Sequence, residues 1–555
     1  MPNPITSISL YSCKLERSGH KTIDFAGGTT AAVRAARDNY FSSNSDIATI
    51  YSTISNATYA RENKVITVGI NADVLDANGV NYCRYVNPQF SNFYFYAFID
   101  NIEYVAPETS RLYIRTDVFV TNMGSISFDE CFVEREHVAD DQNFTHLLAE
   151  PSPTLNHYAR TLIDLNLFAE SLQSYQTYWR PCVFATGSTI TPTTQTDTLG
   201  GIVSQGYLYT PINSTKQAFD DLIDKLVTQN AEILYTCYIP INIYNIATST
   251  NYNLCNILAT SDADTRIITD LCDSTIDTAI TIPISIDFST MGGDTVRNNK
   301  INNYPYRFFK MADMYGQEIT LKPEDMYSFD FKFKLSIGAA PIFSAWIDDY
   351  QNTGNTRAYS INITDFPPVP YAINYYQQYL SLHKNSVEVD LKTANFNLIT
   401  GIASNVISAV AEPTKALTAL TGSLSSVLNY ESKMAGYEDM KRLPPATHNL
   451  PDNTAKVAMR RMGFKLYEYI LKPESRRIIE EFFDAYGYNV STIKTPQISS
   501  RPHYNYVKTN GININGQIAK NDKQELAALF DNGLTVWHIS GGGVYGVYDD
   551  ANAPT

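Results

Sequence analysis

Residues 93–120 read FYFYAFIDNIEYVAPETSRLYIRTDVFV, two runs of β-branched and aromatic residues separated by Pro107, Glu108 and Thr109. Such runs on either side of turn-forming residues predict a β-hairpin. An earlier run, KVITVGI (64–70), has the same composition, and helical periodicity before Glu136 is limited to residues 31–38. The first part of the chain is therefore predicted to be a β domain.

The whole chain has the composition of a sheet-rich protein. Its 555 residues include 39 Tyr and 26 Phe, and only 18% of them are charged. Chains rich in Tyr and Thr and poor in charge favour sheets. Residues 330–337 (DFKFKLSI) alternate polar and apolar side chains, as a strand with one buried face does. We predict a mainly β (α+β), multi-domain fold with β-barrel or sandwich domains.

Polar and proline-rich stretches suggest where the domains meet. The polar stretches 140–153 and 291–303 are candidate junctions, and FPPVP (366–370) and the stretch 443–453 bracket an apolar segment. We expect a first β tube domain at 1–140 completed by C-terminal strands, a mixed α/β domain at 141–300, a β domain at 301–391 continued at 453–555, and a hydrophobic loop insertion at 392–452.

Helix-start and helix-stop signals predict three further helices. The first follows a capping box that starts at Ser214, and the second spans 474–486 and stops at Gly487. Asp522 is expected to cap the third, which ends at Gly533 before a strand at 534–540. The inward faces that we expect are Phe219, Leu222, Ile223 and Leu226 in the first helix, and Ile478, Ile479, Phe482, Phe483 and Tyr486 in the second.

The apolar segment FNLITGIASNVISAVAEPTKALTALTGSLSSVL (396–428) contains only two charged residues, Glu412 and Lys415, beside Pro413. As a helix, each arm would be about 20 Å long, shorter than the roughly 30 Å hydrocarbon core of a bilayer. Two interpretations are open: a helical hairpin buried in a globular core, or a loop that leaves the protein and enters a membrane. The apolar residues concerned are Leu398, Ile399, Ile402, Val406, Ile407, Val410, Leu417, Leu420, Leu424, Val427 and Leu428.

Charge and cysteine content exclude some classes of protein. The formal net charge of −15 argues against a protein that grips nucleic acid by its phosphates. The seven cysteines are too far apart for a redox pair or a zinc knuckle, so we expect free thiols in a protein made in a reducing cytosol. The first twenty residues do not resemble a secretory signal.

No motif gives a positive reason to predict an enzyme, a cofactor or a metal. Gly541, Gly543 and Gly546 match G-x-G-x-x-G, but a dinucleotide site needs a following helix and a distant acidic residue. We expect a flexible strand end there instead. The spacings of His137, His146 and His157 do not fit metal binding, and the pair Asp262 and Asp264 lacks the rest of a calcium loop. Carboxylate pairs for glycoside cleavage stay open, because the fold sets their partners.

Several stretches, taken in order, resemble the tail-knob (distal tail tube) proteins of small short-tailed phages of Gram-positive bacteria. They lie at both ends of the chain and cover about 100 residues. The residues that carry the resemblance are 87–104 with 111–120, 131–138 with Asp140 and Asp141, and then Phe482, 486–488, 504–508, Gly516 and 530–538.

The resemblance implies a structural virion protein at the distal end of the tail, assembled in the host cytoplasm. It implies a homo-hexameric ring that contacts other tail proteins and through which phage DNA leaves. It also implies hydrophobic loops, here at 392–452, that plug the tube and later penetrate the host cytoplasmic membrane. The rival interpretations are a receptor-binding adhesin for cell-wall glycans and a cell-wall hydrolase.

Overall fold

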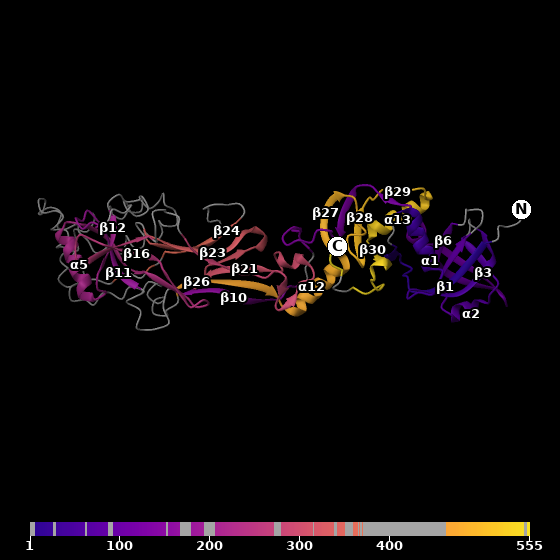
Figure 1. Ribbon diagram of the computed structural model, residues 1–555, viewed down its shortest axis with the longest axis horizontal. Helices are drawn as coiled ribbons and strands as arrows, with labels where there is room; N and C mark the ends of the chain where they lie inside the picture. Colours follow the sequence, from indigo (N-terminus) through magenta and orange to yellow (C-terminus); the bar gives the residue numbers. More distant parts are fainter. Residues whose placement is uncertain are drawn as a thin grey trace, which may run out of the picture. The chain divides into compact units, whose positions relative to one another are not determined.

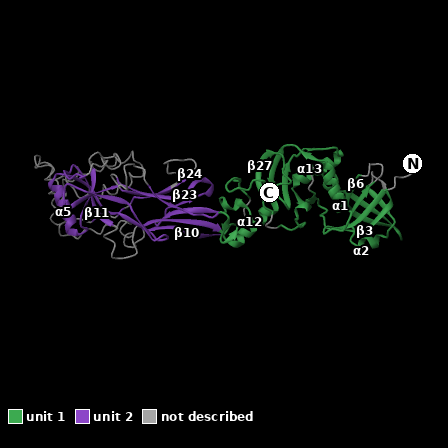
Figure 2. Cartoon of the chain, viewed as in Figure 1, with its two compact units in different colours: residues 1–156, 288–306, 471–555 green, residues 157–287, 307–470 purple. Residues whose placement is uncertain are grey.

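The computed structural model describes residues 6–25, 29–60, 64–86, 93–150, 154–166, 179–193, 206–270, 279–314, 316–337, 341–349, 359–364, 366, 369, 462–548 and 552–554. The chain forms two compact units (Figure 2). Unit 1 contains residues 1–156, 288–306 and 471–555, and unit 2 contains residues 157–287 and 307–470. The four-part division expected above stays a prediction.

Unit 1 contains a closed barrel in the order β1-β3-β4-β7-β6-β5 (Figure 1). Its interior is filled by alternate apolar side chains such as Leu10, Ile66 and Leu112, and by Leu75 of helix α2 (Ala72–Ala77). The predicted hairpin is confirmed as β6 and β7. The barrel strands are β1 (Thr6–Cys13), β3 (Ala48–Ala60), β4 (Val65–Val68), β5 (Tyr82–Val86), β6 (Tyr94–Ala106) and β7 (Thr109–Thr116).

The second half of the hairpin is shorter than predicted. Strand β7 ends at Thr116, and residues 118–122 form the short helix α3 (Val118–Asn122) instead of continuing the strand. The cause is Asp117, whose carboxylate accepts a hydrogen bond of 3.1 Å from the Val120 N–H and so caps the helix.

A second sheet of unit 1 joins the two ends of the chain. Its order is β2-β30-β28-β9-β27. Strands β2 and β30 are parallel, with Lys21 opposite Thr535. Trp537, Tyr504 and Val133 lie in the core behind it. The strands are β2 (Lys21–Asp24), β9 (Cys131–Glu136), β27 (Tyr488–Lys494), β28 (Tyr504–Asn510) and β30 (Leu534–His538), and a small pair consists of β8 (Ser127–Phe128) and β29 (Ile514–Asn515).

Three longer helices pack in unit 1. Helix α1 (Thr30–Tyr40) confirms the periodicity at 31–38. Helix α13 (Lys520–Asn532) ends at Gly533 as predicted, but Asp522 lies in its first turn and does not cap it, since Ala519 is the N-cap. Helix α12 (Pro473–Tyr486) also stops at Gly487.

The inward face of α12 was predicted incorrectly. Ile479 and Phe483 are buried, but Ile478 and Tyr486 are 52% and 46% exposed. Glu480 and Asp484 are buried in their place. These two carboxylates can face inward because Glu480 pairs with Arg297 and Asp484 accepts a hydrogen bond from Asn298.

The expected strand end after residue 540 is also wrong. Strand β30 ends at His538, and residues Ile539–Gly541 form a short 3₁₀ helix, η8. Gly541 has no room for a side chain, because a Cβ would lie 1.8 Å from the Pro502 carbonyl oxygen. Beyond it, Tyr545 and Tyr548 pack their rings 5.9 and 5.4 Å from that of Trp537.

Unit 2 contains three sheets around one large core that includes Phe331, Phe343 and Phe464. The six-stranded sheet has the order β15-β14-β10-β26-β21-β22. Its strands are β10 (His157–Asn166), β14 (Asn242–Asn245), β15 (Thr250–Asn253), β21 (Phe308–Asp313), β22 (Glu318–Leu321) and β26 (Gly463–Leu471).

The other two sheets of unit 2 are antiparallel. The predicted alternation at 330–337 is confirmed for the apolar face, because Phe331, Phe333 and Leu335 of strand β23 are fully buried. It fails on the other face at Lys334, which is only 4% exposed. The five-stranded sheet contains β11 (Trp179–Thr186), β12 (Gly206–Pro211), β13 (Glu232–Pro240), β16 (Cys255–Ala259) and β17 (Thr265–Asp270); the four-stranded sheet contains β18 (Ile280–Pro283), β23 (Met326–Ser336), β24 (Ile342–Asp349) and β25 (Tyr359–Ile363).

Helix α5 (Lys216–Thr228) covers the five-stranded sheet with the four predicted apolar side chains buried. Its cap differs from the prediction by one residue. The hydroxyl of Thr215, not Ser214, accepts the Ala218 N–H at 3.2 Å.

Strands make up most of the described elements of both units, so the predicted mainly β (α+β) fold is confirmed.

The remaining short elements and the membrane search complete the description. They are β19 (Thr290–Met291), β20 (Asp294–Thr295), η4 (Asn299–Asn302) and η5 (Pro323–Asp325). In the described part of the chain, no helix is long and apolar enough to cross a bilayer. The hydrophobic segment 396–428 and Cys272 lie outside the described residues.

Candidate functional site: a buried polar cluster

The two stretches predicted to be polar junctions come together inside unit 1. Residues 137–150, which follow β9, and residues 297–303 meet α12 and the turn before β28. We call the result the polar cluster. It consists of His137, Asp141, Glu150, Arg297, Asn298, Lys300, Glu480, Asp484, Arg501 and Asn552.

Helix α12 supplies the anionic side of the cluster. The Asp484 carboxylate pairs with Arg297 Nη1 at 2.9 Å and accepts a hydrogen bond from Asn298 Nδ2 at 2.7 Å. One turn earlier, Glu480 Oε1 accepts the Arg297 backbone N–H at 3.1 Å. Burial raises the pKa of Glu480, and the two nearby arginines oppose that shift. The carboxylates lie on one face because residues four apart in a helix are neighbours.

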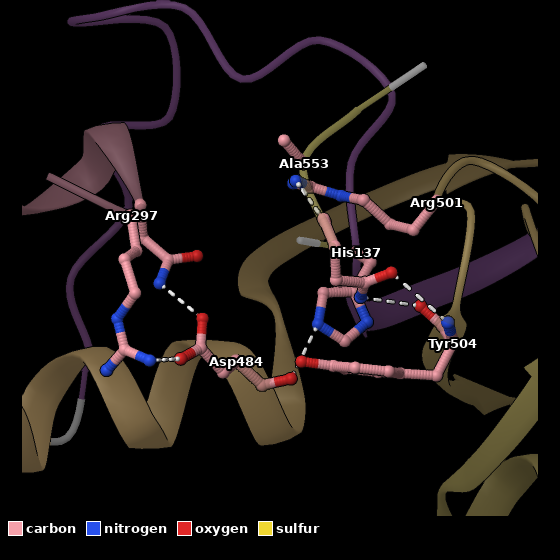
Figure 3. Close-up of a pocket in the computed structure, with 8 residues that line it drawn as sticks. His137, Arg297, Asp484, Arg501, Tyr504 and Ala553 are labelled. Carbon is pink, nitrogen blue, oxygen red and sulfur yellow. Dashed lines mark hydrogen bonds and ion pairs between the residues drawn. The ribbon is translucent and has the colours of Figure 1, made fainter. Parts of the chain in front are cut away.

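His137 connects helix α12 to strand β28 through both ring nitrogens. Figure 3 shows its contact with Asp484. Nδ1 accepts the Tyr506 N–H at 2.7 Å, so Nε2 carries the proton and donates to the Asp484 carbonyl at 3.0 Å. Burial, and then the positive charge of Arg501, lower the pKa of His137 to about 3. The imidazole is therefore neutral at pH 7 and serves as a fixed connector.

Lys300 and Glu150 form a second buried pair in the cluster. Lys300 Nζ donates to Glu150 Oε1 at 2.5 Å and to the Leu148 carbonyl at 2.8 Å. The same carboxylate oxygen accepts the Asn489 N–H at 2.7 Å. Burial lowers the pKa of Lys300, while Glu150 opposes the shift. Such a pair fixes the geometry of the segments that carry it, because breaking it leaves a buried charge unpaired.

The C-terminal residues close the other side of the cluster. Arg501 Nη1 donates to the Asn552 carbonyl at 3.2 Å, and the Asn552 side chain accepts the His503 N–H at 3.0 Å. Asp141 accepts the Tyr488 hydroxyl at 2.8 Å, and burial raises the pKa of this carboxyl. Arg501 Nη2 lies 3.8 Å from the Asp141 carboxylate, so Arg501 connects Asn552 to Asp141.

The polar groups of the cluster are already paired with one another, and little space is left between them. The cavity in the cluster has a volume of about 10 Å³, which is room for about one water molecule. His137 has both nitrogens occupied, and the Asp484 carboxylate is paired. Among the described residues no group of three or more His, Cys, Asp or Glu is placed to hold a metal ion.

Contacts within unit 1 also hold the residues next to the four points at which the chain enters or leaves that unit. The Lys472 N–H donates to the Asn156 carbonyl at 2.9 Å, beside the first and last of these points. At the second, the rings of Phe144 and Phe288 are 5.2 Å apart. At the third, Tyr306 packs 5.7 Å from Phe483 of α12. Contacts within unit 1 therefore hold the residues at which the chain enters and leaves this unit.

None of the predicted plug residues can be compared with this site, since 396–428 lies outside the described residues. Of the three histidines that we weighed for metal binding, only His137 belongs to the polar cluster. The sequence analysis treated 140–153 and 291–303 as junctions and missed that they pair. The available signal was the density of Asn, Asp and Arg in MGGDTVRNNKINN (291–303).

The comparison with known protein families shows to which family the chain belongs. Residues 274–553, just over half of the chain, match the family of the C-terminal domain of tail knob protein gp9 of Bacillus phage phi29. The chain belongs to the tail knob protein gp9 family. Residues 22–127, which include most of the barrel, match the N-terminal part of caudoviral major tail proteins. The resemblance to tail-knob proteins is therefore confirmed.

Relatives and a solved structure agree with the gp9 family. Tail knob protein gp9 of Bacillus phage PZA is 26% identical, with 88% of this chain and 90% of that protein covered. That of phage phi29 is 25% identical with the same coverage. The tail knob protein gp12 of bacteriophage C1 has a similar fold, with a TM-score of 0.56, 15% identity, and 96% and 97% of the two chains covered. The chain is a structural component of a phage tail and so of the virion.

Proposed function

We propose that six copies of this gp9-family chain form the distal tail tube through which phage DNA leaves, and that a hydrophobic loop from each copy plugs the tube until infection. On release, the loops penetrate the host cytoplasmic membrane. The observation that carries the proposal is the apolar segment 396–428, which interrupts a tail-knob chain and contains only two charged residues.

The ends of the insertion support a loop that changes its environment. Strand β25 ends at Ile363 and β26 begins at Gly463, and both strands belong to unit 2. Ile363 and Phe464 are buried in the same core, where the ring of Phe464 lies 4.8 Å from that of Phe343. Because the described strands on either side of the insertion are held in the core of unit 2 by their own side chains, we expect that release of the loop need not unfold unit 2.

The energetics allow two states for the loop. Apolar surface contributes about 25 cal/mol per Å² when it is buried, whether against other loops or in lipid. Each arm alone is too short to cross the bilayer, so membrane opening requires several loops together. The net charge of −15 would let DNA pass the wall without tight phosphate contacts.

The test compares the full-length protein with a variant in which residues 396–428 are replaced by a short Gly/Ser linker. Dye-loaded liposomes should leak with the full-length protein across a range of pH and should stay intact with the variant. Both proteins should form rings with a central hole in negative-stain images. The absence of leakage at every pH would overturn the membrane role, and the absence of rings would overturn the tube.

A further inference from the structure

A second cavity lies in unit 2 and shares no residue with the polar cluster. Its volume is about 510 Å³, within the range of roughly 300–1,000 Å³ that is typical of small-molecule sites. It is formed along neighbouring strands of the six-stranded sheet, β10, β26 and β21 (Figure 1). The hairpin between β21 and β22 completes it.

The cavity occupies the face of the sheet that does not pack on the core. Along β26, Phe464 and Leu466 are fully buried, whereas Lys465 and Tyr467 point to the other face and line the cavity. Along β10, Leu165 is buried and Asp164 lines the cavity. Because side chains alternate between the two faces of a strand, Asp164, Lys465 and Tyr467 all face the cavity.

The lining is rich in hydrogen-bond acceptors. Asp164, Asp313 and Glu318 are the three acidic residues of the lining. Asp164 pairs with Lys465 at 3.0 Å and Glu318 with Lys310 at 2.9 Å, and Asp313 Oδ1 accepts the Gln317 N–H at 2.9 Å, so each carboxylate keeps part of its acceptor capacity. Oδ1 of Asp164 is buried and has no hydrogen-bond partner in the described part of the chain. A ligand for such a wall must donate several hydrogen bonds and must not be an anion.

The cavity also has an apolar side. Tyr467, Met314 and Ile246 line it, and Ile246 is 39% exposed. A bare metal ion would gain nothing from these side chains, and no metal-binding group is formed by the described residues. A ligand that combines hydroxyl donors with an apolar face fits both sides of the lining.

We propose that this cavity binds a neutral saccharide. The hydroxyl groups of a pyranose would donate to the carboxylates of Asp164 and Glu318, and its C–H face would pack on Tyr467. This binding site is independent of the tube and plug proposed above, so either proposal can fail without the other.

The experiment measures saccharide binding to the full-length protein by isothermal titration calorimetry and saturation-transfer NMR. The probes are glucose, galactose and N-acetylglucosamine, with glucose 6-phosphate as the anionic analogue. At least one neutral sugar should bind saturably, and the phosphate should weaken binding at least tenfold because of the acidic lining. Purified neutral wall polysaccharide, compared with the free sugar, shows which source of the same chemistry is preferred.

Variants locate the site. Tyr467→Ala should weaken binding at least tenfold, and Tyr467→Phe should keep most of it because the ring face remains. The matched control is Tyr469→Ala on the same strand, whose ring stacks 4.9 Å from Phe308 outside the cavity. Circular dichroism verifies that each variant is folded. Absence of saturable binding by every probe, calcium binding that depends on Asp164, or equal loss in Tyr467→Ala and Tyr469→Ala would overturn the proposal.

Discussion

Asn298 Nδ2 donates a hydrogen bond of 2.7 Å to the Asp484 carboxylate, and the two residues are 186 positions apart in the chain. This contact makes the middle segment 288–306 part of the same compact unit as the C-terminal helix α12. The polar cluster therefore links segments that are far apart in the sequence. Its contribution to the free energy of unfolding can be measured by replacing one side chain at a time.

Replacing Asp484 by Ala should destabilise unit 1 by about 3 kcal/mol, because Arg297 loses its 2.9 Å partner in a partly buried site. The matched control is Glu481→Ala on the exposed face of α12, whose pair with Arg477 is largely exposed and should contribute at most about 0.5 kcal/mol. Denaturant unfolding, with hydrogen exchange at α12, measures both. Similar losses in the two variants would contradict this role of the cluster.

The pH dependence of stability should contain a contribution from His137. Its pKa is about 3 in the folded protein against 6.5 for a free imidazole, so the unfolded chain binds the proton more readily. The stabilisation is present above pH 6.5 and is lost as pH falls towards 3. Between pH 6 and 4 the wild type should lose about 1.4 kcal/mol per pH unit more than His137→Gln.

This comparison removes the other titrating groups. Asp141 and Glu480 have raised pKa values, which act in the opposite direction, but they titrate in both proteins and cancel in the difference. Urea unfolding at several pH values gives the two slopes. Parallel slopes would mean that His137 is not held neutral.

Gly487 should tolerate no side chain. Its φ is +60°, and a Cβ would lie 2.2 Å from the Glu136 carbonyl oxygen, so Gly487→Ala should cost at least about 3 kcal/mol. Gly511 has a similar φ of +71° with nothing near its Cβ position, and Gly511→Ala should cost only about 1–2 kcal/mol. Thermal unfolding measures the stability lost in each variant. The difference between the two losses is the cost of the close contact at Gly487, beyond the cost of backbone strain.

Charges on the apolar stripe of the proposed plug should abolish membrane leakage. Leu417→Asp with Leu424→Asp places two carboxylates where lipid contact is expected, at roughly 2.5–3.5 kcal/mol each near a bilayer centre. Dye release should fall at least tenfold, while the melting temperature stays within 2–4 °C of the wild type, about 1 kcal/mol for a domain of this size. Ala419→Asp with Ser426→Asp is the control, because at 100° per residue these two positions would lie on the opposite face of a helix from Leu417 and Leu424, and it should retain more leakage. Equal leakage by the three proteins would exclude this orientation.

Local signals in the sequence predicted local structure well. The turn around Pro107 and the apolar face of the alternation at 330–337 are recovered in the strands β6, β7 and β23. The cap of α5 was predicted one residue too early, because Ser214 and Thr215 both have a hydroxyl and only backbone geometry selects between them.

The polar cluster was not predictable in the same way. A stretch such as 291–303 is interpreted as exposed because polar residues usually are, yet Asn298, Lys300 and Asn302 are buried. Their partners lie about 150 to 190 positions away. For the same reason the inward face of α12 was mispredicted at Ile478 and Tyr486. Glu480 and Asp484 can be buried only because Arg297, which is distant in the sequence, pairs with their carboxylates.

The parallel pairing of β2 with β30 sets a limit on when unit 1 can be finished. Lys21 must wait for Thr535, 514 residues later in synthesis. At about 5–20 residues per second a ribosome needs roughly 25 to 100 s for that length. A nascent chain therefore lacks the completed sheet until Thr535 has been synthesised, and chains terminated before that residue never acquire it. Any assembly surface that depends on this sheet is delayed to the same point, so the proposed ring would select against copies truncated before Thr535.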